Sequence, residues 1–244
     1  MSSCNLEVCF SPAVFNRFEN REAIIVIIDV LRASSAICNA FANGAETIIP
    51  VSEVEEARKM KAGGYLVAAE RDGYVLEFAD FGNSPFNFTR EKVAGRTIAY
   101  STTNGTRIIG MASSCHMTVI GAFLNMSALS QWLAEQGRDV VLFCAGWKDK
   151  FNLEDTICAG AIAEQLIRSG AFATICDSVH ASIDLWQAAR PSPLAYIQKA
   201  AQRSRLRDKG LDDCIEFCLT PDTTDIIPVI INGELKGTRA SELR

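Results

Sequence analysis

The sequence is poor in histidine and lacks several short motifs that mark well-known classes of enzyme. His116 and His180 are the only histidines, too few for an H-E-x-x-H helix or a dinuclear histidine-rich centre. No cysteine has an arginine six positions later, no D-x-D occurs, and no Gly-Lys dipeptide or G-x-G-x-x-G is present. These absences exclude the C-x5-R thiolate phosphatases, the aspartyl-phosphate dehalogenase pattern, P-loop NTPases and the dinucleotide fingerprint.

Long apolar runs and paired cysteine motifs are also missing. The longest aliphatic run, residues 23–28, stops at Asp29 and is far too short to span a bilayer. The chain starts without a basic region followed by an apolar stretch, so we expect a cytoplasmic protein with no membrane partner. The nine cysteines are odd in number and show no C-x-x-C spacing, which indicates free thiols in a reducing compartment.

The balance of charge is acidic, with 29 Asp and Glu against 24 Lys and Arg. A formal net charge of −5 argues against general affinity for nucleic acid. The one basic run, residues 199–209, has no interleaved aromatic residues, and we expect it to be a solvated helix face. An anionic small molecule remains possible as a ligand, but local arginines, lysines or a metal ion must then offset its charge.

Short aliphatic runs alternate with helix-like stretches, a pattern typical of parallel strands joined by helices. We therefore predict a three-layer α/β/α fold with a largely parallel or mixed sheet. The chain is one domain, 1–244, or two packed α/β lobes with a boundary near 110–117. Ser52 and Glu55 have the spacing of a capping box for a helix ending at Ala62. The expected strands are 23–29, 45–51, 65–70, 97–101, 118–123, 139–145 and 171–177, and the expected helices are 33–43, 126–136, 153–168, 183–189 and 194–208. Residues 226–231 and 234–238 predict a hairpin around Asn232-Gly233.

Polar residues follow four of the expected strands at the point where each strand ends. Asp29 and Arg32 follow the first, Glu70 and Arg71 the third, residues 102–106 the fourth, and Glu154 and Asp155 come soon after residues 139–145. In an open parallel sheet, ligands bind outside these carboxyl ends. Carboxylates suit Mg²⁺, arginine matches phosphate or sulfonate oxygens, and amides at a helix start can cradle an oxyanion.

Each of these residues also has an ordinary structural explanation. Asp29 could cap the next helix, and Glu154 and Asp155 are common residues in a first helical turn. Arg71 could form a surface ion pair, and Asn104-Gly105 could be a simple turn. Only the coincidence of four such loops favours a binding site.

The ordered set of motifs resembles the 2-phosphosulfolactate phosphatase family. The similarity runs from about residue 24 to residue 160, and the last third of the chain carries no clear motif. Trp147-Lys148-Asp149-Lys150 departs from it, because this link is bulkier and more charged than the short Gly-containing link of the family. The motifs are Asp29-Val-Leu-Arg-Ala-Ser-Ser, Glu70-Arg71-x-Gly73, Gly82-Asn-Ser-Pro85, Thr102-Thr-Asn-Gly-Thr106, and Cys144-Ala-Gly followed by Leu153-Glu-Asp155 and Cys158-Ala-Gly160.

The resemblance implies a family-specific α/β fold and Mg²⁺-dependent hydrolysis of (2R)-2-phospho-3-sulfolactate to sulfolactate and phosphate, in a route toward coenzyme M. Asp29, Arg32, Glu70 and Arg71 are the expected catalytic residues, with both arginines clamping phosphate or sulfonate oxygens. Mg²⁺ would be held by Asp29 and Glu70, with Glu154 or Asp155. The expected substrate-binding donors are Asn83, Ser84, Thr103, Asn104, Gly105 and Thr106. A homo-oligomer, with a dimer as the usual case, is expected for an enzyme of this size.

Three alternatives stay open from the sequence. The chain could be a phosphatase for another small anionic organic phosphate. It could be a cysteine-dependent hydrolase using Cys144 or Cys158, although the scarcity of histidine weakens that idea. It could also be a non-catalytic binder of phosphorylated or sulfonated metabolites.

Overall fold

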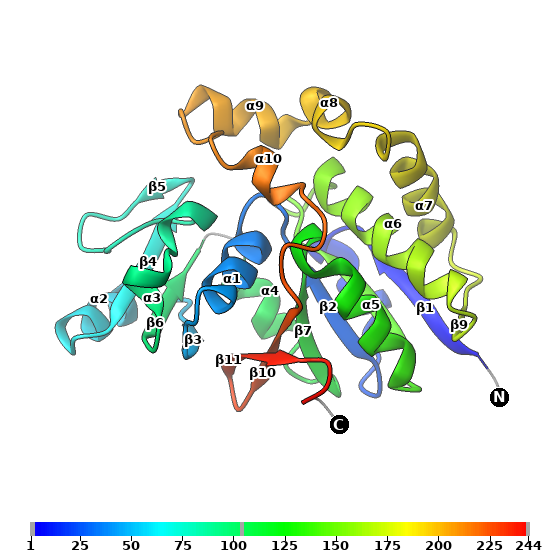
Figure 1. Ribbon diagram of the computed structural model, residues 1–244, viewed down its shortest axis with the longest axis horizontal. Helices are drawn as coiled ribbons and strands as arrows, with labels where there is room; N and C mark the ends of the chain where they lie inside the picture. Colours follow the sequence, from blue (N-terminus) through cyan, green and yellow to red (C-terminus); the bar gives the residue numbers. More distant parts are fainter. Residues whose placement is uncertain (1–2, 103–104, 243–244) are drawn as a thin grey trace.

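The computed structural model describes residues 3–102 and 105–242, and they form an α/β fold around one mixed sheet of 11 strands. The strand order is β5-β4-β6-β3-β11-β10-β7-β2-β8-β1-β9 (Figure 1). The strands are β1 (Cys4–Cys9), β2 (Ile24–Ile28), β3 (Thr47–Pro50), β4 (Leu66–Arg71), β5 (Tyr74–Val75), β6 (Thr97–Ser101), β7 (Met117–Gly121), β8 (Val140–Cys144), β9 (Phe172–Ala173), β10 (Ile226–Ile231) and β11 (Glu234–Arg239).

Helices join most of the strands and cover both faces of the sheet. The α-helices are α1 (Ala33–Ala42), α2 (Val54–Ala62), α3 (Arg90–Val93), α4 (Gly105–Met111), α5 (Met126–Glu135), α6 (Leu153–Arg168), α7 (Asp177–Ala189), α8 (Pro193–Tyr196), α9 (Ala201–Asp208) and α10 (Ile215–Cys218). Short 3-10 helices are η1 (Pro12–Arg17), η2 (Pro85–Asn87), η3 (Phe123–Asn125) and η4 (Ile197–Lys199). None of the helices in the described part of the chain is both long and apolar enough to cross a lipid bilayer.

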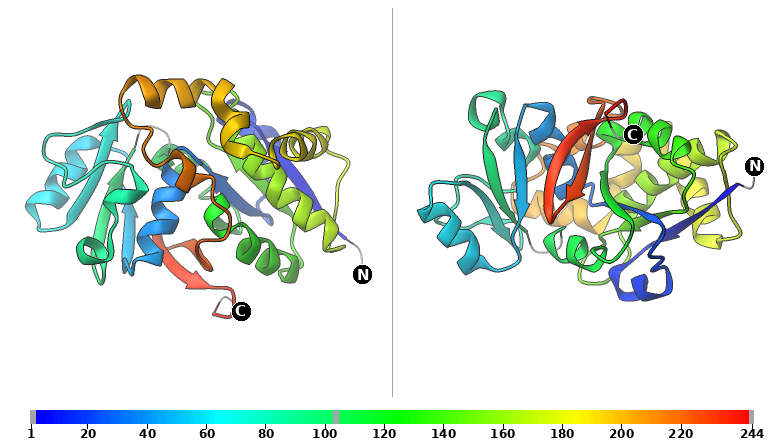
Figure 2. Two further views of the ribbon diagram at one scale, coloured as in Figure 1. Left: turned by 45° about the horizontal axis from the view of Figure 1, so that its top comes forward. Right: turned by 90° about the horizontal axis from the view of Figure 1, so that it is seen from below.

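The sheet consists of two parallel blocks, an antiparallel hairpin between them, and the short edge strand β5, which pairs antiparallel with β4. β7, β2, β8, β1 and β9 form one block, and β3, β6 and β4 form the other. The β10–β11 hairpin pairs with each block at one position only, Val229 with Val119 and Leu235 with Ile48. Seen from below, the hairpin lies between the two blocks (Figure 2, right). The predicted α/β class with a mixed sheet is therefore confirmed.

The buried strand β2 explains why helices lie on both faces. All five of its residues, Ile-Ile-Val-Ile-Ile, are buried, and successive side chains point to opposite faces. Ile24, Val26 and Ile28 pack in the cluster that includes residues of α5, α6 and α7. Ile25 and Ile27 pack in a second cluster with residues of α1. A fully apolar strand is what such two-sided burial requires.

Three local predictions differ from the structure. β1 was not expected, and the strand predicted over 171–177 is only Phe172–Ala173, because Asp177 already begins α7. The predicted helix 194–208 is broken at Ala200, whose backbone is extended with ψ of 137°. The Ser52–Glu55 capping box does not form: Glu53 is the N-cap of α2 without a side-chain capping bond. Ser52 instead accepts a hydrogen bond from Arg71 at its backbone oxygen.

The last three short helices pass over the carboxyl ends of the strands. In Figure 1, α8, α9 and α10 run across the top of the molecule, above the ends of β2 and β4.

Helices α6 and α7 pack closely against each other, and this packing depends on a glycine. A Cβ on Gly160 of α6 would overlap the backbone oxygen of Ser182 and approach Trp186 Cβ to 2.9 Å.

We expect Gly160→Ala to destabilise the fold by about 1–3 kcal/mol, because α7 must move away from α6 to admit the methyl group. Gly110→Ala in α4 is the matched control, since nothing lies within 4 Å of a Cβ there. Relief of backbone entropy should make that control neutral or more stable by about 0.5–1 kcal/mol. Urea unfolding measures both changes, and a Gly160→Ala variant as stable as the wild type would contradict the close approach.

Candidate active site

A cavity lies where the carboxyl ends of β2, β4, β6 and β8 meet helix α9. Segments far apart in the sequence therefore line one cavity. Its lining residues are Asp29, Leu31, Arg32, Glu70, Asp72, Gly73, Asn83, Thr102, Gly146, Trp147, Asn152, Gln202, Arg205, Leu206 and Lys209.

Asp29 and Arg32 reach this cavity from the β2–α1 connection. The backbone N–H of Asp29 donates to Ser34 Oγ at 2.8 Å, and the Ser34 N–H donates to the Asp29 carbonyl at 2.8 Å. These two bonds fix the turn that starts α1. Among the described residues, the Asp29 carboxylate itself accepts only a long bond of 3.4 Å, from the Ala33 N–H. A helix cap is therefore a weak explanation for Asp29, and its carboxylate is available to a ligand.

Glu70 and Arg71 are neighbours on β4, but they point to opposite faces of the sheet. Glu70 lines the cavity and accepts a bond from the Gly73 N–H at its Oε2 atom. Arg71 donates to Ser101 Oγ at 2.9 Å and to the Ser52 carbonyl at 3.2 Å. The structure thus brings Glu70 to the site and does not bring Arg71 there. These bonds give Arg71 a structural role, and its predicted clamp function has no support from this geometry.

The loop before η2 brings Asn83 to the cavity. Asn39 of α1 and Asn43, which follows α1, hold η2 in place: Asn39 Nδ2 donates to the Pro85 carbonyl at 2.8 Å, and Asn43 Nδ2 donates to the Phe88 carbonyl, directly after η2, at 2.9 Å. The buried Tyr100 hydroxyl donates to Asn83 Oδ1, so the Asn83 amide nitrogen remains as a donor. Ser84, also predicted as a donor, begins η2 and is not part of the lining.

The polar segment after β6 is described only in part. Thr102 is buried and lines the cavity. Thr103 and Asn104 lie outside the described residues. Gly105 and Thr106 stand in the first turn of α4. Their predicted role as oxyanion donors stays a prediction.

Asp155 ties the ends of two neighbouring strands to the start of α6. Its Oδ1 accepts from the Val30 N–H at 2.9 Å, directly after β2, and its Oδ2 accepts from the Gly146 N–H at 3.0 Å, directly after β8. The side chain is 1% exposed. Both oxygens are therefore engaged by the backbone, which makes Asp155 a structural acceptor that positions the site and not a side chain open to a metal ion.

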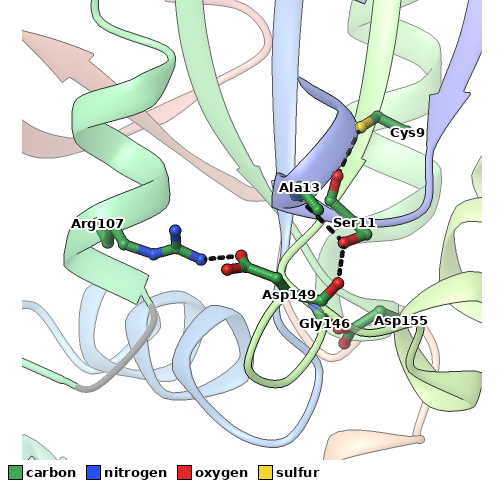
Figure 3. A network of polar contacts seen from close by, with 7 residues as sticks. All are labelled: Cys9, Ser11, Ala13, Arg107, Gly146, Asp149 and Asp155. Atoms are coloured by element: carbon green, nitrogen blue, oxygen red, sulfur yellow. Dashed lines mark hydrogen bonds and ion pairs between the residues drawn. The ribbon is translucent and has the colours of Figure 1, made fainter. Parts of the chain in front are cut away.

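Contacts with Ser11, Arg107 and Asp155 hold the loop between β8 and α6 (Figure 3). Trp147 and Lys150 exchange backbone hydrogen bonds of 3.0 Å, and the two residues between them, Lys148 and Asp149, have φ of 49° and 61°. The Ser11 hydroxyl donates to the Asp149 carbonyl at 2.6 Å, and Arg107 pairs with the Asp149 carboxylate. A tight turn built from residues that disfavour positive φ needs such anchors.

This turn places the indole of Trp147 at the cavity. The Trp-Lys-Asp-Lys segment departs from the family pattern and lies among the polar residues that follow the predicted strand 139–145. Its role could not be inferred, because no short-range signal shows that Ser11 and Arg107 hold it.

Glu154 is the most unusual side chain near the cavity. It is 1% exposed, and neither carboxylate oxygen has a hydrogen-bond partner among the described residues. Burial raises the pKa of Glu154 to about 7, with a further increase from the negative charge of Asp29 and an opposing effect from Arg205. Burial likewise raises the pKa of Asp29 to about 6, which Glu70 increases and Arg32 lowers.

Asp155 adds a third acid to this cluster. Burial raises its pKa, and the charges of Glu154 and Asp29 raise it further, against the effect of its two backbone hydrogen bonds. Three mutually repelling carboxyl groups with little solvent are costly unless positive charge reaches them. The arrangement is therefore one that favours a bound cation.

The residues present fit a magnesium ion that takes only a few of its ligands from the protein. A buried carboxylate without hydrogen bonds, Glu154, and an accessible one, Asp29, are hard oxygen donors. Within the described part of the chain, no three His, Cys, Asp or Glu side chains are grouped as ligands of a single ion. Mg²⁺ commonly uses one or two carboxylates and keeps several waters, so this absence of a closed cage is compatible with it.

The thiols considered as alternative nucleophiles do not reach the cavity. Cys144 and Cys158 are fully buried, and burial raises the pKa of each thiol well above its ordinary value. Protonated buried thiols are poor nucleophiles. Cys214 differs, because a hydrogen bond with Cys218 and the charge of Arg32 lower its pKa to about 7, but it is fully buried and outside the lining. A cysteine-dependent hydrolase is therefore disfavoured.

One wall of the cavity comes from the basic run that was expected to be a solvated helix face. Arg207 is exposed, as expected, but Gln202, Arg205 and Lys209 line the cavity. No periodic pattern in the sequence indicates this wall, because α9 has only eight residues. The residues that Gln202 and Lys209 contact are 171 and 137 positions away in the chain.

Comparison with known proteins identifies the relatives of this chain. A family model described as 2-phosphosulpholactate phosphatase matches residues 9–233. A protein of Caldanaerobacter subterraneus named "Probable 2-phosphosulfolactate phosphatase" is 38% identical over 223 residues, covering 90% of this chain and 92% of the relative. A protein of the same name from Thermotoga maritima is 36% identical over 208 residues, covering 85% of this chain and 89% of the relative.

The isolation of Glu154 leads to a prediction about stability and pH. A carboxyl whose pKa rises from 4.5 to about 7 on folding binds its proton more tightly in the folded state. The fold therefore loses stability as pH rises from about 4.5 to 7, by roughly 3 kcal/mol for a shift of this size. In EDTA, Glu154→Gln should match the wild type near pH 5 and exceed it in stability at pH 8.

Urea unfolding at the two pH values measures this difference. Glu135→Gln, at an exposed position in the last turn of α5, is the control, and its stability profile should follow that of the wild type. Loss of stability in Glu154→Gln at pH 8 would show that Glu154 has a partner that the geometry does not reveal.

Proposed function

This chain belongs to the 2-phosphosulfolactate phosphatase family, and we propose that it hydrolyses 2-phospho-3-sulfolactate to sulfolactate and inorganic phosphate with Mg²⁺. The printed names of its relatives support the substrate. We further propose the (2R) substrate, a cytoplasmic location, a role in coenzyme M synthesis and a homo-oligomeric state, all of which follow from the family or from general expectation. The single observation that carries the reaction type is the meeting of Asp29, Arg32 and Glu70 in one cavity, beside the buried Glu154.

The carboxylates of Asp29 and Glu70 would repel an anionic substrate in this cavity unless positive charge lies between them and the substrate. Arg32 is 6% exposed and lies close enough to Asp29 to lower the pKa of that carboxyl. Arg205 and Lys209 add positive charge from the opposite wall. A phosphate that enters would still meet Asp29 and Glu70, so a divalent cation on these carboxylates resolves the repulsion.

Asp29 and Glu154 are the residues that would hold Mg²⁺, with Glu70 contributing directly or through water. Of the predicted metal ligands, Asp155 is the one whose two oxygens are already bonded to backbone amides. When bound, Mg²⁺ polarises the phosphoryl group and stabilises the leaving alkoxide.

The protein side chains then bind and orient the phosphate. Arg32 offers a planar fork of donors to two phosphate oxygens. The Asn83 amide nitrogen, fixed by Tyr100, supplies a further donor, and Thr102 adds a hydroxyl. Burial of these groups strengthens their electrostatic effect on charge that develops in the transition state. The arrangement serves direct attack by water and attack by the Asp29 carboxylate equally.

A phosphate-release screen with and without Mg²⁺ tests this proposal. We expect release from 2-phospho-3-sulfolactate that stops in EDTA and returns with Mg²⁺. A non-catalytic binder would release nothing from any organic phosphate, a phosphatase of different specificity would prefer another ester, and a cysteine enzyme would keep its activity in EDTA and lose it to iodoacetamide.

Asp29→Asn and Arg32→Ala should each lower kcat/KM by about 100-fold or more, because each removes a charge that acts on the reacting phosphate. Arg168→Ala, at the exposed end of α6, is the control and should change kcat/KM less than threefold. Circular dichroism checks that all three variants fold. Full activity in either Asp29→Asn or Arg32→Ala would remove that residue from the site.

A further inference from the structure

Helix α9 is fixed against the cavity by bonds at both of its ends. Gln202 in its first turn is buried and donates from Nε2 to the Leu31 carbonyl at 3.1 Å, one residue before Arg32. Beyond its last turn, Lys209 donates to the Asp72 carbonyl, and its Nζ lies 4.7 Å from the Tyr74 ring centroid. The helix therefore connects the β2–α1 loop to the β4–β5 loop and closes one side of the cavity.

Arg205 lies between these two anchors with its guanidinium held in place. Its Nε donates to Gln202 Oε1 at 2.8 Å, and its Cζ lies 5.0 Å from the Trp147 ring centroid. Its Nη2 atom is buried and has no hydrogen-bond partner among the described residues. A buried charged donor without an acceptor is costly in the free protein.

Neighbouring charges do not already satisfy Arg205. Arg203 of the same helix pairs with Asp212 at 2.7 Å and does not line the cavity, so this ion pair does not involve Arg205. Glu154 acts on Arg205 only through space, because its oxygens have no hydrogen-bond partner in the described residues either. Arg205 and Glu154 are thus close enough to interact electrostatically, but no hydrogen bond joins them among the described residues.

The surroundings of Arg205 favour a large, weakly hydrated anion. Guanidinium is itself weakly hydrated and stacks on aromatic faces, here that of Trp147. Leu206 adds an apolar lining residue beside it. A sulfonate has three acceptor oxygens with charge spread over them, which suits this partly apolar setting better than a compact carboxylate does.

We propose that Arg205 holds the sulfonate of the substrate and thereby selects sulfonated phosphate esters over esters that lack this group. Arg32 and the carboxylate cluster act on the phosphate, and Arg205 acts on the distal end of the same molecule. Gln202 and Trp147 orient Arg205. The inference rests on the proposed phosphatase function and adds to it the residue that determines specificity.

The test compares two substrates in wild type and in Arg205→Ala. The substrates are 2-phospho-3-sulfolactate and 2-phospholactate, which keeps the phosphate and carboxylate but lacks the sulfonate. We expect Arg205→Ala to lower kcat/KM for the sulfonated ester by about 100-fold, as expected for a buried charged contact, and for 2-phospholactate less than threefold. Arg205→Lys should recover only part of the loss, because it keeps the charge without the fork.

Arg207→Ala is the matched control, since Arg207 belongs to the same helix and is exposed. It should leave both kcat/KM values within twofold of the wild type. Equal losses for the two substrates in Arg205→Ala would overturn the assignment and leave Arg205 as a balance for the Glu154 charge. Unchanged kcat/KM values for both substrates in Arg205→Ala would overturn it as well.

A binding measurement separates failure of this inference from failure of the proposed function. Isothermal titration of the wild type with 3-sulfolactate and with lactate needs no turnover. Arg205→Ala should weaken sulfolactate binding at least tenfold while lactate binding stays the same. If the wild type releases no phosphate, yet Arg205→Ala binds sulfolactate more weakly than the wild type does, the proposed reaction fails and the sulfonate site stands. If phosphate is released normally but sulfolactate binding does not depend on Arg205, the sulfonate site is refuted.

Discussion

A single buried carboxylate, Asp155, joins the ends of the neighbouring strands β2 and β8. By accepting one hydrogen bond from the Val30 amide and one from the Gly146 amide, it fixes the chain after β2 and after β8 at the start of α6. Asp29 and Arg32 stand beside the first of these points, and Trp147 follows the second. Glu154 is the preceding residue on α6. Asp155 therefore helps to set the positions of Asp29, Arg32, Glu154 and the indole relative to one another.

The same arrangement concentrates charge that the fold alone does not neutralise. Glu154 is a buried acid and Asp29 a partly exposed one, both with raised pKa values, and Arg205 has a buried donor without a partner among the described residues. Each of these groups costs stability in the free protein. A cation and an anion bound as proposed would relieve both costs together. This explains how a protein of net charge −5 can bind a polyanionic substrate: the compensation is local.

The sequence predicted the parts of the site that follow buried strands, and it missed those that depend on distant contacts. Residues 24–28 are all aliphatic, so the strand and the position of Asp29 at its end could be inferred. The faces of the sheet toward which Glu70 and Arg71 point could not be inferred, because β4 is short and buried on both faces. The α9 wall and the Trp147 turn depend on partners such as Asp72, Ser11 and Arg107, which no local pattern reveals. Asp155 was predicted as a metal ligand because sequence shows an acid and not the amides around it.

The most direct test of this account is the location of a bound divalent ion. Mn²⁺ can replace Mg²⁺ in oxygen sites and gives an anomalous X-ray signal, so crystals of the protein soaked in Mn²⁺ would show the ion itself. The account predicts one strong peak within coordination distance of both Asp29 and Glu154, about 2.0–2.3 Å from their oxygens. A peak at other residues, or none at this cluster with the cavity open to solvent, would contradict it.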